Sequence, residues 1–173
     1  MNEALQNLLT RRSVRQYRDE MIPEDILDAI LEAGLYAPSG RNFQPVTMVA
    51  VRDRATRDLL SKINAAVMGA DSDPFYGAPV VIVVLADRNL SHLGVEDGSL
   101  AMGNLMNAAH ALGIGSCWIN RAKEEFESEE GKALLKKWGL DGDFIGIGHC
   151  ILGYPASDLP PARERRAGRI VKI

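Results

Sequence analysis

Residues 79–86 read Pro-Val-Val-Ile-Val-Val-Leu-Ala, and this stretch decides the class of fold. Seven apolar residues follow the proline in succession, without the polar alternation that marks a strand with one face in water. The stretch is also too short to cross a membrane as a helix. It therefore predicts a β-strand that is buried on both faces.

Helices and further strands are predicted on both sides of this strand. Shorter apolar segments predict strands at 46–51, 114–119 and 145–152. Apolar residues at helical spacing predict helices at 2–10, 23–35, 54–67, 98–112 and 129–138. Strands and helices alternate, so we expect a mixed sheet covered by helices, with residues 1–173 forming a single domain.

Two segments lack a helical or strand pattern over most of their length. Residues 69–77 are rich in Asp, Ser, Pro and Gly and predict a loop, on which Phe75 and Tyr76 are candidate exposed aromatic residues. Residues 156–168 are rich in Pro and Arg, and residues 170–173 are a candidate edge strand. Such an arm indicates contact with a partner chain, and so does the predicted helix at 98–112, which is apolar on more than one face.

The charge and composition exclude several classes of protein. The 173 residues include 20 Lys and Arg against 23 Asp and Glu, and the resulting net charge of −3 argues against a dedicated nucleic-acid-binding protein. Residues 1–10 lack the apolar region of a signal peptide, and no apolar run is long enough to span a membrane. We therefore expect a cytoplasmic protein without membrane contact, in which Cys117 and Cys150 are reduced, buried thiols.

A basic cluster follows the first predicted helix and reads Arg11-Arg12-Ser13-Val14-Arg15. Guanidinium groups present planar, bidentate donors that match a phosphate group, and the Ser13 hydroxyl adds another donor. The alternative interpretation is a solvated basic turn. A second group of basic residues near the other end of the chain favours an anion site, and it comprises Arg163, Arg165, Arg166, Arg169 and Lys172.

The sequence contains no familiar catalytic motif. It has no nucleophile elbow, no P-loop and no zinc-binding His-Glu-x-x-His pair. Its histidines, His92, His110 and His149, are dispersed, and we interpret them as packing residues rather than metal ligands. An anion site without acid–base residues is typical of a protein that delegates its chemistry to a phosphate-bearing cofactor.

Five segments resemble, in order and over nearly the whole chain, the FMN-dependent nitroreductase family in its short form. The first is the basic cluster extended to Tyr17. The others are Ala-Pro-Ser-Gly-Arg-Asn-Phe-Gln-Pro at 37–45, Gly-Ala-Pro-Val-Val-Ile-Val at 77–83, Ala-Ala-His-Ala-Leu-Gly-Ile-Gly-Ser-Cys-Trp-Ile at 108–119 and Ile-Leu-Gly-Tyr-Pro at 151–155. Any one segment alone is unspecific, whereas all five in the same order are specific to the family.

This resemblance implies an α+β fold with a mixed, mainly antiparallel sheet and helices on both sides. It also implies a homodimer in which residues 156–173 form an extended C-terminal arm that is exchanged with the partner subunit. Two FMN molecules would lie at the interface, each contacted by segments from both subunits.

The resemblance further implies roles for individual residues at the cofactor. The FMN phosphate and ribityl chain would be held by Arg11, Arg12, Ser13 and Arg15. The flavin ring would be contacted from the neighbouring subunit by Pro38, Ser39, Gly40 and Asn42. A backbone N–H would be offered to flavin N5 by the end of a strand, at Trp118, Ile119 and Asn120. Asn64 is a candidate for the pyrimidine edge, and Arg163 and Arg165 are candidates for the phosphate, with Arg166 as an alternative to either.

The implied activity is that of an NAD(P)H-dependent FMN oxidoreductase with a ping-pong reaction. NADH or NADPH would reduce the flavin and leave, and a nitroaromatic, quinone or similar electron-poor acceptor would then enter the same pocket. No side chain is required as a catalytic acid or base, and no metal is expected. Candidate residues at the rim of the pocket are Arg41, Phe75, Tyr76 and Arg121, for which surface or dimer packing is the alternative. An FMN carrier or redox-responsive module with little turnover is the alternative function, and dehalogenation or flavin fragmentation on the same fold is a third.

Overall fold

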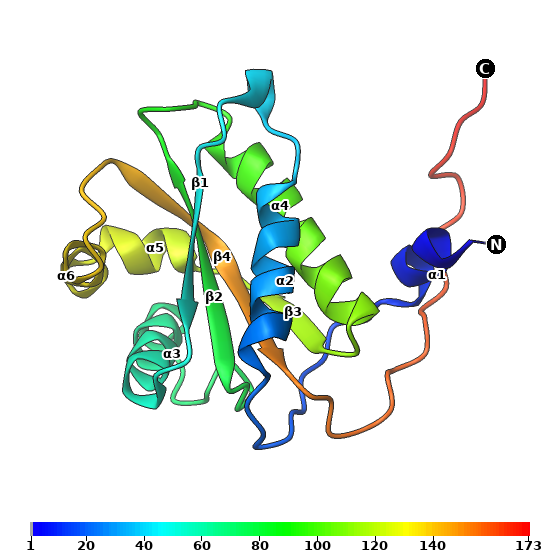
Figure 1. The fold of residues 1–173 in the computed structure, drawn as a ribbon, viewed down its shortest axis with the longest axis horizontal. Coiled ribbons are helices and arrows are strands. Elements are labelled where there is room, and N and C mark those ends of the chain that lie inside the picture. Colours follow the sequence, from blue (N-terminus) through cyan, green and yellow to red (C-terminus); the bar gives the residue numbers. More distant parts are fainter. Residues whose placement is uncertain (1) are drawn as a thin grey trace.

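The computed structural model describes residues 2–173 as one α+β unit with a central sheet between two layers of helices (Figure 1). Met1, part of the predicted domain 1–173, lies outside the described residues. The helices are α1 (Glu3–Thr10), α2 (Glu24–Leu35), α3 (Arg54–Met68), α4 (Gly94–Ala111), α5 (Ala122–Glu127) and α6 (Glu129–Lys137), with a short 3₁₀ turn at Gly40–Asn42. The strands are β1 (Val46–Val51), β2 (Val80–Asp87), β3 (Gly115–Ile119) and β4 (Phe144–Gly153).

The sheet has the strand order β1-β2-β4-β3, and every pair of neighbours is antiparallel. Strand β2 lies inside it, with Val83 opposite Val49 of β1 on one side and His149 of β4 on the other. Residues Val80 to Ala86 have no exposed surface. The prediction of a strand buried on both faces is therefore confirmed, and so is the predicted α+β fold with a mainly antiparallel sheet.

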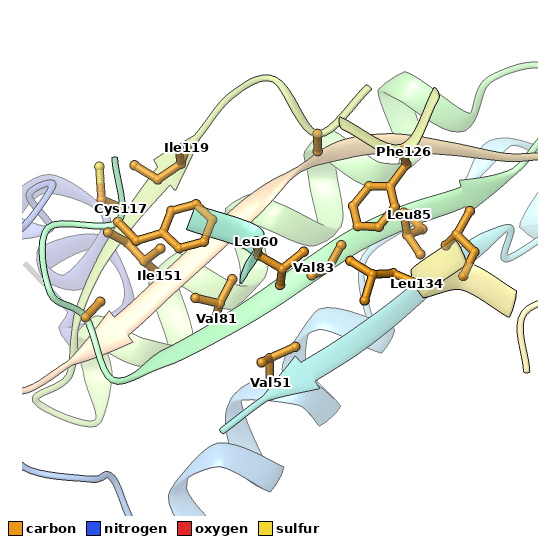
Figure 2. Packing of buried hydrophobic residues seen from close by; sticks show 14 residues of the cluster. Val51, Leu60, Val81, Val83, Leu85, Cys117, Ile119, Phe126, Leu134 and Ile151 are labelled. Carbon is orange, nitrogen blue, oxygen red and sulfur yellow. The ribbon is translucent and has the colours of Figure 1, made fainter. Parts of the chain in front are cut away.

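Alternate residues of β2 belong to two separate hydrophobic clusters, one on each face of the sheet. Val81, Val83 and Leu85 pack with residues of α3, α5 and α6, and Figure 2 shows this cluster around Leu60, Phe126 and Leu134. Val80, Ile82 and Val84 pack against α2 and α4 on the other face. The two-residue period of a strand places these side chains alternately on the two faces, so a wholly apolar strand needs helices on both.

Most predicted boundaries agree with the structure to within two residues. Helix α4 begins at Gly94, four residues before the predicted start at residue 98. Helix α5 was not predicted, because its six residues are too few for an apolar period to be visible. Residues 170–173 form no strand, and every residue from 156 to 173 is exposed. The exchange of this arm with a partner chain stays a prediction.

Gly146 of β4 illustrates how closely α5 packs on the sheet. A Cβ atom at this position would lie 2.2 Å from the carbonyl oxygen of Ala122. That contact is with backbone at the start of α5, so no side-chain rotation can relieve it. The close approach of the helix therefore requires a glycine here.

We expect Gly146→Ala to lower the free energy of unfolding by about 1–3 kcal/mol, because the extra methyl group forces α5 away from β4. Urea denaturation followed by circular dichroism measures this change. Ala50→Ser, an exposed position on β1, is the control and should change stability by about 0.5 kcal/mol or less. Equal stability of Gly146→Ala and the parent protein would contradict the proposed packing constraint.

Candidate functional site

The predicted basic cluster is fixed between α1 and the edge of the sheet. Arg11 caps the C-terminus of α1, and its backbone N–H donates to the Asn7 carbonyl. Ser13 forms a parallel bridge with Ser116 of β3, and the Val14 N–H donates to the Ser116 carbonyl oxygen at 2.9 Å. The arginines on either side of this bridge are therefore held beside β3 rather than on a free turn.

The cluster contains buried donors without partners. Nη1 of Arg11 and Nε of Arg12 are both inaccessible and make no hydrogen bond within the described chain, and the same is true of the Ser116 hydroxyl. No ion pair between these arginines and a carboxylate occurs among residues 2–173. Buried donors without partners are costly. Arg11, Arg12 and Ser13 are only half-buried, so an anion with several oxygen acceptors that settled on them would offset this cost.

His110 of α4 lies beside the same arginines. Burial, followed by the charges of Arg11 and Arg12, lowers its pKa below the ordinary value for histidine. Its Nε2 atom lies 2.9 Å from the Thr10 hydroxyl, which also connects α1 to α4. The sequence did not identify His110 as part of this cluster, since the two segments lie 100 residues apart.

A pocket of about 360 Å³ lies next to the basic cluster and brings several of the predicted residues together. Arg15 and Tyr76 line it, with the Arg15 guanidinium carbon 5.9 Å from the centre of the Tyr76 ring. Residues Cys117 to Arg121, at the end of β3, line it as well. The end of this strand thus borders a pocket, and its predicted backbone contact with flavin N5 stays a prediction.

The Asn64 amide is hydrogen-bonded within the chain. The side chain is wholly buried, and its Nδ2 donates to the Asn120 carbonyl at 2.9 Å and to Glu125 Oε2 at 3.1 Å. Its Oδ1 accepts a hydrogen bond from Arg121 Nε at 3.0 Å. These contacts use both amide hydrogens and one of the two lone pairs of the oxygen. The predicted contact of Asn64 with the pyrimidine edge stays a prediction.

A buried pair that was not predicted continues from Asn64. Glu125 of α5 and His149 of β4 are both fully buried, with Glu125 Oε2 and His149 Nε2 2.6 Å apart. The His149 ring lies between Phe75 and Phe126, whose ring centres are 5.1 and 6.2 Å away. His149 is a packing residue, as predicted, and its acidic partner comes from an element that the sequence pattern did not reveal.

The loop at residues 69–77 differs from its prediction at Phe75. This side chain is fully buried in the core beside His149, so it is not an exposed residue at the rim of the pocket, and that prediction is wrong. Asp73 determines the turn, because its carboxylate accepts hydrogen bonds from the backbone of Phe75 and Gly77. Tyr76, at a φ of 53°, remains 43% exposed at the pocket, as expected.

Asp73 also pairs with a buried arginine behind the loop. Burial of its carboxyl group raises the pKa, but hydrogen bonds from Arg57 and Ser61 and from the turn outweigh this effect and lower the pKa to about 2. Arg57 Nη2 lies 2.5 Å from Asp73, and Arg57 Nε donates to the Ala78 carbonyl. The ion pair therefore fastens the pocket loop to α3.

We expect Asp73→Asn to lower the free energy of unfolding at pH 7 by about 1–3 kcal/mol, less than for a fully buried pair because the carboxylate is partly exposed. A depressed pKa gives stabilisation that is complete above the ordinary value near 4 and is lost as the pH falls towards 2. The stability difference between variant and parent should thus narrow across that range. Denaturant titrations at several pH values measure it, and a constant difference would contradict the assignment.

The segment predicted to come from a neighbouring subunit lies away from this pocket within one chain. Pro38 and Ser39 line a separate pocket of about 220 Å³ between α2 and α4, which shares no residue with the first. The backbone N–H of Gly40 donates to the buried Asp97 carboxylate at 2.9 Å, which fixes a turn with positive φ angles at Arg41 and Asn42. Arg41 and Asn42 are exposed and contribute to neither pocket.

The C-terminal arm begins beside the basic cluster and then leaves the surface. Ser157 and Pro160 line a groove with residues 13–16, and the Ala156 N–H donates to the Gln16 carbonyl. Farther along, Arg163 and Arg165 are exposed, and Arg165 donates only to the Arg163 carbonyl. The described chain does not place either arginine at the cluster, so their role at a phosphate stays a prediction.

Two further features bear on the class of site. Among residues 2–173, no three His, Cys, Asp or Glu side chains come together as a candidate metal site. No helix in that range has the length and apolar character needed to cross a membrane.

This geometry defines a class of protein, namely an α+β sheet protein with a basic cluster and an adjoining pocket. Comparison with known proteins identifies the family, because the family model for the nitroreductase family matches residues 8–154. A protein of Archaeoglobus fulgidus is 36% identical over 162 residues, which are 91% of this chain and 88% of that protein. The chain belongs to the nitroreductase family, and the resemblance seen in its sequence is confirmed.

Two other relatives are informative because of what they bind or reduce. The FMN reductase [NAD(P)H] of Bacillus subtilis is 30% identical over 177 residues, covering 90% of this chain and 67% of that protein. The crystal structure of a nitroreductase with bound FMN from Bacteroides fragilis has a TM-score of 0.91 and 32% identity, and the match covers all of both chains.

Proposed function

We propose that this protein is an NAD(P)H-dependent FMN oxidoreductase that works by a ping-pong reaction, with nitroaromatics, quinones or similar electron-poor compounds as acceptors. Its family membership, the FMN reductase among its relatives and the FMN bound to the similar structure support the enzyme class and the cofactor. When bound, FMN supplies the hydride chemistry, which no side chain of the protein offers.

The buried, unpartnered donors of the basic cluster carry this proposal. Arg11 Nη1, Arg12 Nε and the Ser116 hydroxyl are inaccessible and unpaired, and a phosphate group provides the oxygen acceptors that they lack. Arg11, Arg12, Ser13 and Arg15 would hold the phosphate and ribityl chain. Trp118, Ile119 and Asn120 would border the ring from the adjoining pocket.

The protein's own contribution is binding, orientation and electrostatics. Arginines held by α1 and β3 present charge at a fixed position, so little reorganisation is required when an anion binds. Backbone N–H groups at the end of β3 would offer hydrogen bonds to the ring. Arg15 and Tyr76 would limit the space available to the nicotinamide and then to the acceptor.

The proposal includes a homodimer, because one chain does not assemble all the predicted parts. Pro38, Ser39, Gly40 and Asn42 lie away from the pocket in their own subunit, in a turn that Asp97 fixes. Beyond its start at residues 156–160, which lie beside residues 13–16, the arm is exposed, and its apolar residues Ile170, Val171 and Ile173 are not covered within the described chain. Exchange of both segments between subunits would complete the cofactor site and bury these side chains.

The visible spectrum of the purified protein, recorded before and after anaerobic addition of NADH and then NADPH, tests the function. We expect a flavin spectrum that bleaches with at least one nucleotide and returns when a quinone is added. Bound flavin that stays oxidised would support a carrier or redox-responsive module instead. Absence of flavin, even after incubation with FMN, would overturn the proposal.

A further inference from the structure

Arg121 lies at the edge of the pocket with part of its guanidinium group unused. The residue precedes α5 with a φ of 77°, and its side chain is half-buried and lines the pocket. Nε donates to Asn64 Oδ1 at 3.0 Å. Its two terminal nitrogens make no hydrogen bond or ion pair within residues 2–173. Arg121 therefore has donors available to a molecule in the pocket.

The pocket has no carboxylate that would neutralise this charge. Asp73 is the acidic residue among its lining side chains, and Arg57 and Ser61 already engage its carboxylate. The remaining cations are Arg15 and Arg121, and neither pairs with an acid in the described chain. The pocket therefore carries a net positive charge. One of its two arginines, Arg15, belongs to the segment assigned above to the cofactor.

The orientation of Arg121 is determined by buried polar groups. Asn64 binds the Arg121 guanidinium, the Asn120 carbonyl and Glu125 Oε2 at the same time. Glu125 is held in turn by His149, and Asn64, Glu125 and His149 have no exposed surface. Burying a carboxylate and an imidazole is costly compared with apolar packing, and such groups are retained in some proteins because they specify one arrangement.

We propose that Arg121 recognises an anionic group on the electron acceptor, and that Asn64, Glu125 and His149 are positioning residues that orient it. The preferred acceptors would be electron-poor aromatic compounds with a carboxylate or a similar anionic substituent. A guanidinium group binds a carboxylate through two parallel hydrogen bonds, which gives direction as well as affinity. This inference rests on the proposed function, because it assigns the acceptor of the same pocket.

The test compares two acceptors that differ in one charged group, 4-nitrobenzoate and nitrobenzene, with the FMN-loaded protein. In Arg121→Gln we expect the ratio of kcat/KM for 4-nitrobenzoate to kcat/KM for nitrobenzene to fall by roughly 10-fold or more, as for the loss of one charge-assisted interaction. Arg121→Lys, which keeps the charge without the planar fork, should give an intermediate ratio. Arg88→Gln, at an exposed site paired with Asp143, is the control and should keep the parent ratio.

Binding of an unreactive anion provides a readout that does not depend on turnover. Benzoate, titrated into the oxidised protein and followed by the flavin spectrum, should bind roughly 10-fold more weakly to Arg121→Gln than to the parent. Benzamide, its uncharged counterpart, should be affected less. Equal losses for benzoate and benzamide would mean that Arg121 shapes the pocket without recognising charge, and would overturn the inference.

A double-mutant cycle tests the positioning role. Asn64→Ala should lower the same kcat/KM ratio by several-fold, but it should cause little further loss when combined with Arg121→Gln, because Asn64 acts through Arg121. Additive losses would contradict this role. Suppose that the parent protein binds FMN and is bleached by NAD(P)H, but that neither the kcat/KM ratio nor the benzoate affinity changes in Arg121→Gln. Only the inference about Arg121 then fails. If the parent protein takes up no FMN, the proposed function fails as well.

Discussion

The double variant Arg11→Ala/Arg15→Ala should be purified as a colourless protein with a native fold. Each arginine would contribute a charge-assisted interaction of about 1.5–3 kcal/mol to binding of the FMN phosphate and ribityl chain. Loss of both predicts a Kd for FMN that is roughly 100- to 10,000-fold higher. Flavin absorbance of the purified protein and a fluorescence titration with FMN measure this change.

The matched control removes the same amount of charge elsewhere. Arg54→Ala/Arg88→Ala deletes two exposed arginines, each paired with an aspartate on the surface, and should keep its FMN. The far-ultraviolet circular dichroism of both double variants should equal that of the parent. Stoichiometric FMN in Arg11→Ala/Arg15→Ala would refute the assignment of the phosphate site.

Removal of residues 156–173 should weaken both dimerisation and FMN binding. The arm has no buried residue in a single chain, so its loss should leave the sheet and its two cores intact. In the proposed dimer it covers the partner and brings Arg163 and Arg165 to the phosphate. Analytical ultracentrifugation should therefore show a shift towards monomer, with a reduced flavin content in the same sample.

A less drastic variant separates the two effects. Arg163→Ala/Arg165→Ala keeps the length of the arm, and it should lower FMN affinity by roughly 10-fold or more while the dimer persists. Lys172→Ala, near the end of the arm, serves as its control for loss of positive charge. A truncated protein that remains dimeric and yellow would show that the arm takes no part in either function.

Much of the architecture follows from local patterns in the sequence. The uninterrupted apolar run at 79–86 requires cover on both faces, and the structure provides α2 and α4 on one face and α3, α5 and α6 on the other. The basic cluster was also evident, because its members are neighbours in the chain. Short-range periodicity and composition were sufficient for these features.

Contacts between distant residues were not predictable in the same way. Phe75 lies in a polar loop that predicts exposure, yet Asp73 turns the loop so that the ring enters the core beside His149. Glu125 looks like one acidic residue of a charged segment, but it is buried by a helix too short to show a period. The family resemblance made Asn64 a candidate for the pyrimidine edge, whereas its contacts with Asn120 and Arg121 join residues more than 50 positions apart and leave no local pattern.

Helix α1 has no buried residue and is joined to α4 by few polar contacts, among them Asn7 with the Asn107 carbonyl and Thr10 with His110. Such an element opens at a low free energy, well before the sheet unfolds. Arg11 and Arg12 follow directly from it, so detachment of α1 would displace the anion site as well. An anion that bridged these arginines to the edge of β3 would hold α1 in place. Binding of the proposed cofactor would then be coupled to the local folding of the N-terminal segment.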